Sequence, residues 1–253
     1  HPLPMSASES ILRKRLRKFR RLKRGYYSFL IVVGAYLLSF ALPLIANSKA
    51  LVVRYEGRFY FPIAAYHGAT EFGMQAIGEA DYRDLKKQFA TQGAGNWVLM
   101  PPVPFGPNEA LLDDSGTPPN PPSWAHPMGT DDRGRDVLVR LAYGFNISMT
   151  FALLVTAFGL SAGVAVGALL GYLGGKTDIV GQRFIEVWSS LPFLYTIIII
   201  SSIVVPVYLP GHYQLAQPSF WLLVVILSAF DWMGITYYVR GDRKSTRLNS
   251  SHL

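Results

Sequence analysis

Hydrophobic residues fill four long stretches of this 253-residue chain in which charged side chains are almost absent. These stretches cover residues 26–46, 147–174, 187–208 and 218–238. A helix of about 20 apolar residues crosses the hydrocarbon core of a bilayer, and the shortest of these stretches would already rise about 31 Å. The pattern therefore predicts an all-α polytopic membrane protein with four transmembrane helices and an insert at 47–146 between the first and second.

The insert has a different pattern, in which short polar and apolar segments alternate. Strand-forming residues flank Glu56-Gly57 in the segment 52–61, which predicts a hairpin. Residues 79–90 read as a polar helix with one apolar stripe, made of Tyr82, Leu85 and Phe89. Nine prolines between positions 101 and 127 exclude regular structure there. We expect a small folded insert outside the cytoplasm; a spacer without partners is the alternative.

The second apolar stretch carries glycine at every fourth position: Gly159, Gly163, Gly167 and Gly171. On a helix this spacing forms a groove that lets another backbone approach closely. Glycine is unfavourable in a helix interior, by about 1 kcal/mol relative to alanine. The repetition therefore favours a helix-packing seam over a general enrichment of glycine in membrane helices.

The third and fourth stretches each hold one unusual residue. Pro192 is expected to kink the third helix, with nearby serines satisfying the freed backbone groups. Asp231 lies in the predicted cytoplasmic third of the fourth, and an ionisable residue inside a span is a functional candidate. The alternative is that Asp231 is solvated at the interface. At the cytoplasmic edge of the third stretch, Glu186 is expected to pair with Arg183.

The excess of positive charge is confined to a segment near the N-terminus. The chain carries a formal charge of +8, and nine of its 24 basic residues lie between positions 13 and 24. Without that run and Glu9, 15 basic residues balance 15 acidic ones. A basic run directly before an apolar stretch marks the cytoplasmic side, so residues 1–25 are predicted to be cytoplasmic. A retained helix is favoured over a cleaved signal peptide, and nucleic-acid binding is not expected.

A charged segment, HPMGTDDRGRDVLVRLAYGFNISMT (126–150), leads into the second apolar stretch. Asp131, Asp132 and Asp136 offer the oxygen ligands of a hard-cation site. Arg133, Arg135 and Arg140 favour instead an ion-pair network in which Asp131 or Asp132 caps a helix starting near Gly134. We therefore expect no metal. Further along, the GKT at 175–177 fails the phosphate-loop pattern because Leu170 stands where its first glycine is required.

This segment resembles the GTDDxGRDxxSRxxYGxRxSL motif of C-type permease subunits in bacterial peptide/nickel ABC importers, and the long insert resembles that of the Yej-type (microcin C) permease. Asn146 departs from the usual arginine. The matching residues form one ungapped run: His126, Gly129, Thr130, Asp131, Asp132, Gly134, Arg135, Asp136, Arg140, Tyr143, Gly144 and Ser148.

The resemblance implies a multi-pass inner-membrane permease that moves oligopeptides by alternating access. Its implied partners are a homologous permease subunit, two ABC ATPase subunits, a periplasmic substrate-binding protein, the peptide substrate and membrane lipid. It implies no cofactor and no catalysis by this subunit, because the partner ATPases would hydrolyse ATP. The alternatives are a membrane-anchored periplasmic interaction or sensor protein and, third, a secondary transporter.

Both ends of the chain look foreign to this pattern. Residues 1–4 precede a plausible start at Met5, and residues 243–253 have a polar composition that predicts an unstructured, artefactual tail. Arg240-Gly241 matches the end of the family's fourth helix, after which the family has a coupling segment and two more helices. We therefore expect a C-terminally truncated fragment of a six-helix permease.

Overall fold

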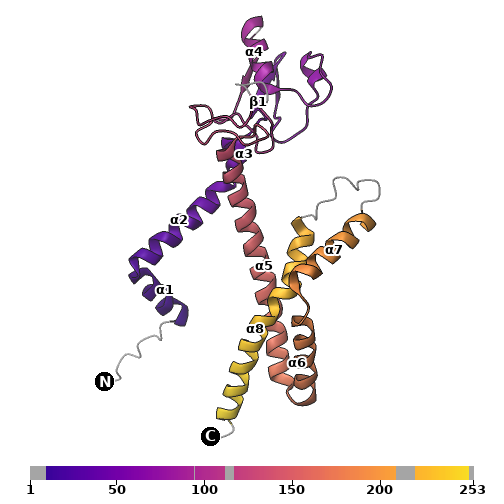
Figure 1. Cartoon of the computed structure of the whole chain (residues 1–253). Helices are drawn as coiled ribbons and strands as arrows, with labels where there is room; N and C mark the ends of the chain where they lie inside the picture. Colours follow the sequence, from indigo (N-terminus) through magenta and orange to yellow (C-terminus); the bar gives the residue numbers. More distant parts are fainter. Residues whose placement is uncertain (1–9, 94, 112–116, 209–219, 251–253) are drawn as a thin grey trace, which may run out of the picture. The chain divides into compact units, whose positions relative to one another are not determined.

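The computed structural model describes residues 10–93, 95–111, 117–208 and 220–250, which form two compact units divided after Ile147 (Figure 1). The described residues exclude 209–219, which contain the link between the third and fourth predicted stretches, and both chain ends, 1–9 and 251–253. The elements in chain order are α1 (Ile11–Arg21), α2 (Lys23–Ser39), α3 (Leu42–Ile45), β1 (Val52–Tyr55), β2 (Arg58–Tyr60), the 3-10 helix η1 (Ala69–Phe72), α4 (Tyr82–Gln92), β3 (Trp97–Leu99), α5 (Val137–Leu173), α6 (Gly175–Ser189), α7 (Phe193–Tyr208) and α8 (Phe220–Ser250).

The first predicted span, 26–46, is not one continuous helix. Most of the basic run forms α1, which buries none of its residues, and α2 then carries the apolar sequence as far as Ser39. Pro43 follows in α3. A proline ring collides with the carbonyl group four residues earlier and lacks an N–H, and four residues before Pro43 is Ser39. The helix therefore ends where the proline requires it to end.

The insert contains a three-stranded antiparallel sheet with the order β2-β1-β3. The predicted hairpin is confirmed: Tyr55 pairs with Arg58 across a two-residue turn. Both turn residues have positive φ, 48° at Glu56 and 79° at Gly57. That backbone twist matches the right-handed twist of the strands.

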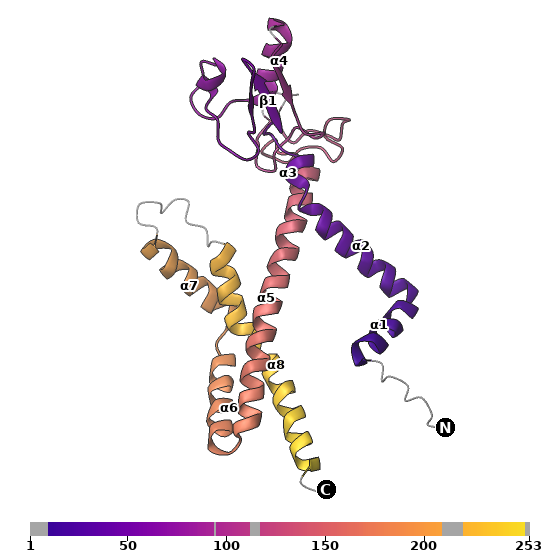
Figure 2. The same ribbon diagram turned by 180° about the vertical axis from the view of Figure 1, so that it is seen from behind.

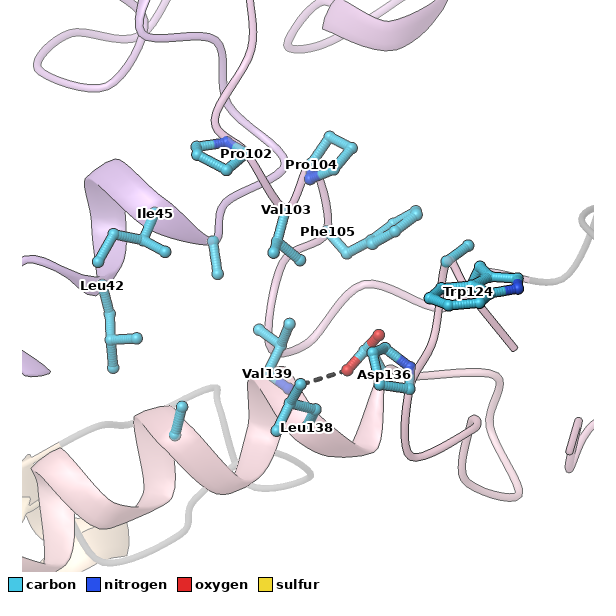
Figure 3. A pocket seen from close by; sticks show the side chains of 14 residues that line it. Leu42, Ile45, Pro102, Val103, Pro104, Phe105, Trp124, Asp136, Leu138 and Val139 are labelled. Carbon is cyan, nitrogen blue, oxygen red and sulfur yellow. Dashed lines mark hydrogen bonds between the residues drawn. The ribbon is translucent and has the colours of Figure 1, made fainter. Parts of the chain in front are cut away.

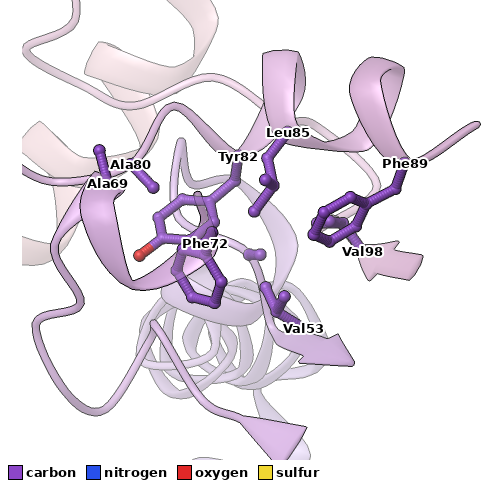
Figure 4. Close-up of a cluster of buried hydrophobic side chains, with 9 residues drawn as sticks. Val53, Ala69, Phe72, Ala80, Tyr82, Leu85, Phe89 and Val98 are labelled. Atoms are coloured by element: carbon purple, nitrogen blue, oxygen red, sulfur yellow. The ribbon is translucent and has the colours of Figure 1, made fainter. Parts of the chain in front are cut away.

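Helix α4 packs on this sheet and supplies three of the nine core residues (Figure 4). Asp81 caps the helix by accepting hydrogen bonds from the N–H groups of Arg83 and Asp84, and Gly93 ends it in a left-handed conformation. The predicted stripe is confirmed, because its three members are all buried. The core consists of Ala50, Val53, Ala69, Phe72, Ala80, Tyr82, Leu85, Phe89 and Val98. The insert is therefore a folded unit, and its proline-rich part has no helix or strand in the described residues from 101 to 127.

In its described residues, the second unit contains helices and no strand (Figure 2). Two of its helices are long and apolar enough to cross a membrane, Val137–Leu173 and Phe220–Gly241, and Gly175–Ser189 with Phe193–Ile200 makes a third if this bent pair is one span. The helical membrane class is confirmed, whereas the described residues provide two or three spans where the sequence predicts four.

Three boundaries differ from the predicted ones. Helix α5 begins at Val137, ten residues before 147, because no proline or glycine interrupts residues 137–143. The third stretch begins inside α6 and bends by 77° around Pro192, so the expected kink is a complete break. Residues 243–250, expected to lack structure, continue α8; they contain no proline or glycine to end it.

Candidate functional site

The charged motif caps the long helix α5 through Asp136. The N–H of Val139 donates to Asp136 Oδ1 at 2.8 Å, and a carboxylate at this position also interacts favourably with the helix dipole. The prediction that Asp131 or Asp132 caps a helix near Gly134 is wrong. The helix starts three residues later than Gly134, which places Asp136 directly before its first turn.

Asp136 also holds a buried histidine. His126 Nδ1 lies 2.7 Å from Asp136 Oδ2, and the two side chains are 8% and 1% exposed. The ring of His126 packs against Phe105 at a centroid distance of 4.4 Å. A buried carboxylate is stable only when its oxygens are hydrogen-bonded, and here the cap and the histidine use both. The sequence shows both residues, but their spacing of ten positions carries no signal that they pair.

Asp131 organises the turn before the helix. It accepts hydrogen bonds from the N–H of Arg133 at 3.0 Å and the N–H of Arg135 at 2.9 Å, and its other oxygen accepts from Arg135 Nε at 2.8 Å. Arg140 Nε lies 3.7 Å away. Burial raises the pKa of Asp131, but the bonds from Arg135 and Arg133 outweigh it and lower the pKa to about 2. The predicted ion-pair network is confirmed for Asp131 with Arg135 and Arg140, whereas Asp136 pairs with His126 instead.

The remaining motif residues shape the same turn. Gly129 and Gly134 have φ values of 70° and 74°, and a Cβ on Gly129 would lie 2.5 Å from the Asn120 carbonyl oxygen. Both positions therefore require glycine. Thr130 exchanges hydrogen bonds with Asn120, through its N–H and its hydroxyl oxygen. Asp132 is exposed, and within the described residues no group of acidic or histidine side chains could hold a metal ion.

An apolar cavity of about 480 Å³ adjoins the buried pair (Figure 3). Asp136 is its one ionisable lining residue, and both oxygens of that carboxylate are already bonded. The other walls are apolar and come from α3, the proline-rich segment and the first turns of α5, including Leu42, Ile45, Phe105, Trp124 and Val139. This cavity can take an apolar group but offers no free polar anchor.

Two hydrogen bonds join α5 to the preceding helices of the first unit. The Tyr143 hydroxyl donates to the Ala46 carbonyl at 2.9 Å. Asn146 Nδ2 donates to Ser39 Oγ at 2.7 Å. The residue that departs from the family motif therefore makes a helix–helix contact, which the sequence did not reveal because Ser39 lies 107 positions away.

In the second unit, α8 packs against the glycines of α5. A Cβ on Gly163 would lie 2.6 Å from the Trp232 carbonyl oxygen, and one on Gly167 would lie 2.8 Å from that of Thr236. At Gly159 the added atom would collide with the carboxylate of Asp231. The buried Thr236 hydroxyl lies 3.3 Å from the Gly163 carbonyl oxygen, across the interface. Close helix packing is thus confirmed at these three glycines; at Gly171 it stays a prediction.

A second close contact joins α5 to α6. Leu170 is buried, and its side chain fills the space above Gly181, where a Cβ would collide with it. The predicted Arg183–Glu186 pair is confirmed at 2.6 Å. Helices α6 and α8 are joined by Asp178 and Arg240, whose guanidinium donates to both carboxylate oxygens, one at 2.7 Å. Sequence reasoning missed this pair.

Asp231 lies in the apolar part of α8, nine residues before Arg240, and its predicted place in the cytoplasmic third of the span stays a prediction. Pro192 lies in the break between α6 and α7, and both Asp231 and residues of this break line one cavity of about 330 Å³.

Comparison with known proteins relates the chain to transport permeases. No protein-family profile matches the sequence. The inner membrane ABC transporter permease protein YejE of Escherichia coli strain K12 is 40% identical over 245 residues, which are 96% of this chain and 67% of that protein. The peptidoglycan transport system permease protein YejE of Agrobacterium fabrum is 32% identical over 254 residues, covering 91% and 63%. The oligopeptide transport system permease protein OppC of Haemophilus influenzae is 34% identical over 122 residues, covering 48% and 35%.

Proposed function

Because this chain belongs to the family of inner-membrane ABC transporter permeases, we propose that it is part of the path by which oligopeptides or peptide-like compounds enter the bacterial cytoplasm. The observation that carries the proposal is the 40% identity to the YejE permease over nearly the whole chain. The chain spans about two thirds of the length of the YejE relatives. Relatives named for oligopeptide and dipeptide transport support a peptide substrate.

A permease subunit does no covalent chemistry, and its helices have to alternate between two packed arrangements. Partner ATPases would bias these arrangements by binding ATP. The close seam of α5 and α8 supports this function, because small residues let membrane helices pack tightly against each other. We infer that the partners are a homologous permease subunit, two ATPase subunits and a periplasmic substrate-binding protein.

We also propose a topology with a cytoplasmic N-terminus and the insert outside. The basic run in α1 supports it, because basic segments beside apolar helices stay in the cytoplasm. Helix α5 has 37 residues and would measure about 55 Å, whereas the hydrocarbon core is about 30 Å thick. Its capped end, with the ion-pair network, would then project beyond the outer surface of the membrane.

Uptake by the complete transporter tests the proposed function. The permease that contains this chain is expressed with its partner subunits in a strain that lacks its own peptide importers. We expect ATP-dependent accumulation of a radiolabelled oligopeptide, and none when the permease is omitted. A correctly assembled complex that accumulates no peptide would overturn the proposal. The folded insert alone, bound to a periplasmic protein without any transport, would favour the sensor alternative.

A further inference from the structure

Helices α6 and α7 form a broken pair. Helix α6 ends at Ser189 and α7 begins at Phe193, with a bend of 77° between them (Figure 2). Pro192 in the break has no N–H to donate. The Leu191 N–H still reaches the Trp188 carbonyl at 3.3 Å, and the Thr196 N–H reaches that of Pro192 at 3.0 Å. Regular helical bonding is therefore interrupted over a few residues.

This break lies beside Ala229 and Phe230 of α8. Trp188 Nε1 donates to the Ala229 carbonyl at 3.0 Å. The ring of Phe230 stacks on Trp188 and meets Phe193 edge-on, each at a centroid distance of 5.6 Å. The next residue along α8 is Asp231, nine residues before Arg240. The break therefore lies beside Asp231.

Helix α5 provides a second measure of depth. Gly159, which faces Asp231, follows Arg140 by 19 residues and precedes Lys176 by 17, with no charged residue in 141–175. Along α5, Gly159 lies about 21 Å from the helix end at Leu173, and along α8, Asp231 lies about 14 Å from Arg240. Irregular backbone at membrane depth is stable only where protein covers it or where it lines an aqueous path.

The carboxylate of Asp231 has no partner within the described part of the chain. Among the described residues, no hydrogen-bond donor or cation contacts this carboxylate. Asp231 is the one acidic residue between Phe220 and Gly241. It lies close to Gly159, where an added Cβ would collide with the carboxylate. Together with Ser189, Leu191, Phe193 and Phe230 it lines the cavity of about 330 Å³ at the break.

We propose that Asp231 and the α6–α7 break form a cation-accepting site on the translocation path, and that its ligand is the protonated amine of the transported peptide. The proposal rests on the proposed function. A carboxylate in a low-dielectric region requires a cation, and the α-amino group of a peptide is charged at neutral pH. Apart from Ser189, the remaining walls are apolar and aromatic, which suits a peptide side chain.

Site-directed labelling tests the site without requiring transport. The chain contains no cysteine, so Ser189→Cys in the complete transporter introduces a single thiol into the cavity. We expect a water-soluble cationic methanethiosulfonate to label it faster than an anionic one of similar size. Asp231→Asn should reduce this preference at least about tenfold, because the carboxylate concentrates cations locally. Leu191→Cys repeats the measurement if Ser189→Cys assembles poorly.

The control is Val225→Cys, at a position on α8 that is 65% exposed in this chain and outside the cavity. We expect no labelling there. The site would be overturned if thiols at both 189 and 191 resisted both reagents. It would also be overturned if Asp231→Asn left the charge preference unchanged. The first result would show a break sealed by lipid or by a partner subunit.

Uptake then tests the ligand. Asp231→Asn should raise the concentration for half-maximal uptake of a free-amine peptide about tenfold and leave an N-acetylated analogue unaffected, while Asp231→Glu should restore the difference. Equal effects on both peptides would overturn the amine assignment. Failure of wild-type uptake would instead overturn the proposed function, and the labelling result would stand independently.

Discussion

Asp136 binds two buried groups with its two carboxylate oxygens. One oxygen accepts from a first-turn N–H of α5, and the other pairs with the ring of His126. At the scale of single residues, the motif therefore stabilises one end of helix α5. Asp131 does the same for the preceding turn, with Arg135 as its main partner. Acidic side chains that the sequence presents as equivalent thus differ in role, since Asp132 is exposed.

Asp136→Ala should destabilise the protein by about 2–4 kcal/mol. It removes the helix cap, worth about 1 kcal/mol, and leaves His126 buried without its partner, which costs about 1–3 kcal/mol. Thermal unfolding of the detergent-solubilised protein, followed by tryptophan fluorescence, measures the change. Asp132→Ala is the matched control and should not move the transition; equal transitions for both variants would contradict the assigned role of Asp136.

The lowered pKa of Asp131 predicts a pH dependence. Because its pKa is about 2 in the folded protein and 3.8 otherwise, its contribution is complete above about pH 4 and is lost as the pH falls toward 2. For this partly exposed group we expect about 1–2 kcal/mol. The stability difference between wild type and Asp131→Asn should therefore be constant from pH 5 to 7 and shrink below pH 4. A difference independent of pH would rule out this linkage.

At the scale of elements, α8 is held by two different kinds of contact. It contacts α5 where the two helix backbones come close together at glycines, and it contacts α6 through the Asp178–Arg240 ion pair. The side chains of this pair are only 15% and 19% exposed. The first contact is steric and tolerates no added volume, whereas the second is electrostatic and depends on charge of opposite sign.

Gly163→Ala should weaken the α5–α8 seam, because the new methyl group would meet a backbone oxygen at 2.6 Å that cannot move alone. Gly144→Ala is the matched control on the same helix, since no atom lies within 4 Å of its added Cβ. We expect a lower melting temperature and reduced complex yield for Gly163→Ala alone. Equal behaviour of the two variants would show that the seam does not form.

The Asp178–Arg240 pair can be tested by exchange. Arg240→Asp places two negative charges together and should destabilise the α6–α8 contact by about 3–5 kcal/mol. The double variant Asp178→Arg with Arg240→Asp should recover most of that loss. Denaturant unfolding in detergent gives the coupling energy, and additive effects of the two changes would argue against a direct pair.

At the scale of the whole molecule, a folded insert and a helical membrane unit share one chain. The proposed topology places Gln92, at the end of α4, outside the cytoplasm and Thr177, in α6, inside it. A periplasm-dependent reporter should be active when fused at Gln92 and inactive at Thr177. The opposite result would invert the topology and move the capped end of α5 to the cytoplasm.

Local pattern alone determined much of this protein. Apolar length predicted the membrane class, the glycine spacing predicted the seam, and strand and helix periodicity predicted the hairpin and the α4 stripe. These features depend on residues within one or two turns of each other, so the sequence contains their cause. The family motif was also readable, because its residues are contiguous.

Tertiary structure decided what depends on distant partners. The pairs Asn146–Ser39 and Arg240–Asp178 join residues 107 and 62 positions apart, and nothing in either local sequence selects the partner. The same holds for Asp231, whose place beside Gly159 and the α6–α7 break follows from how three helices pack.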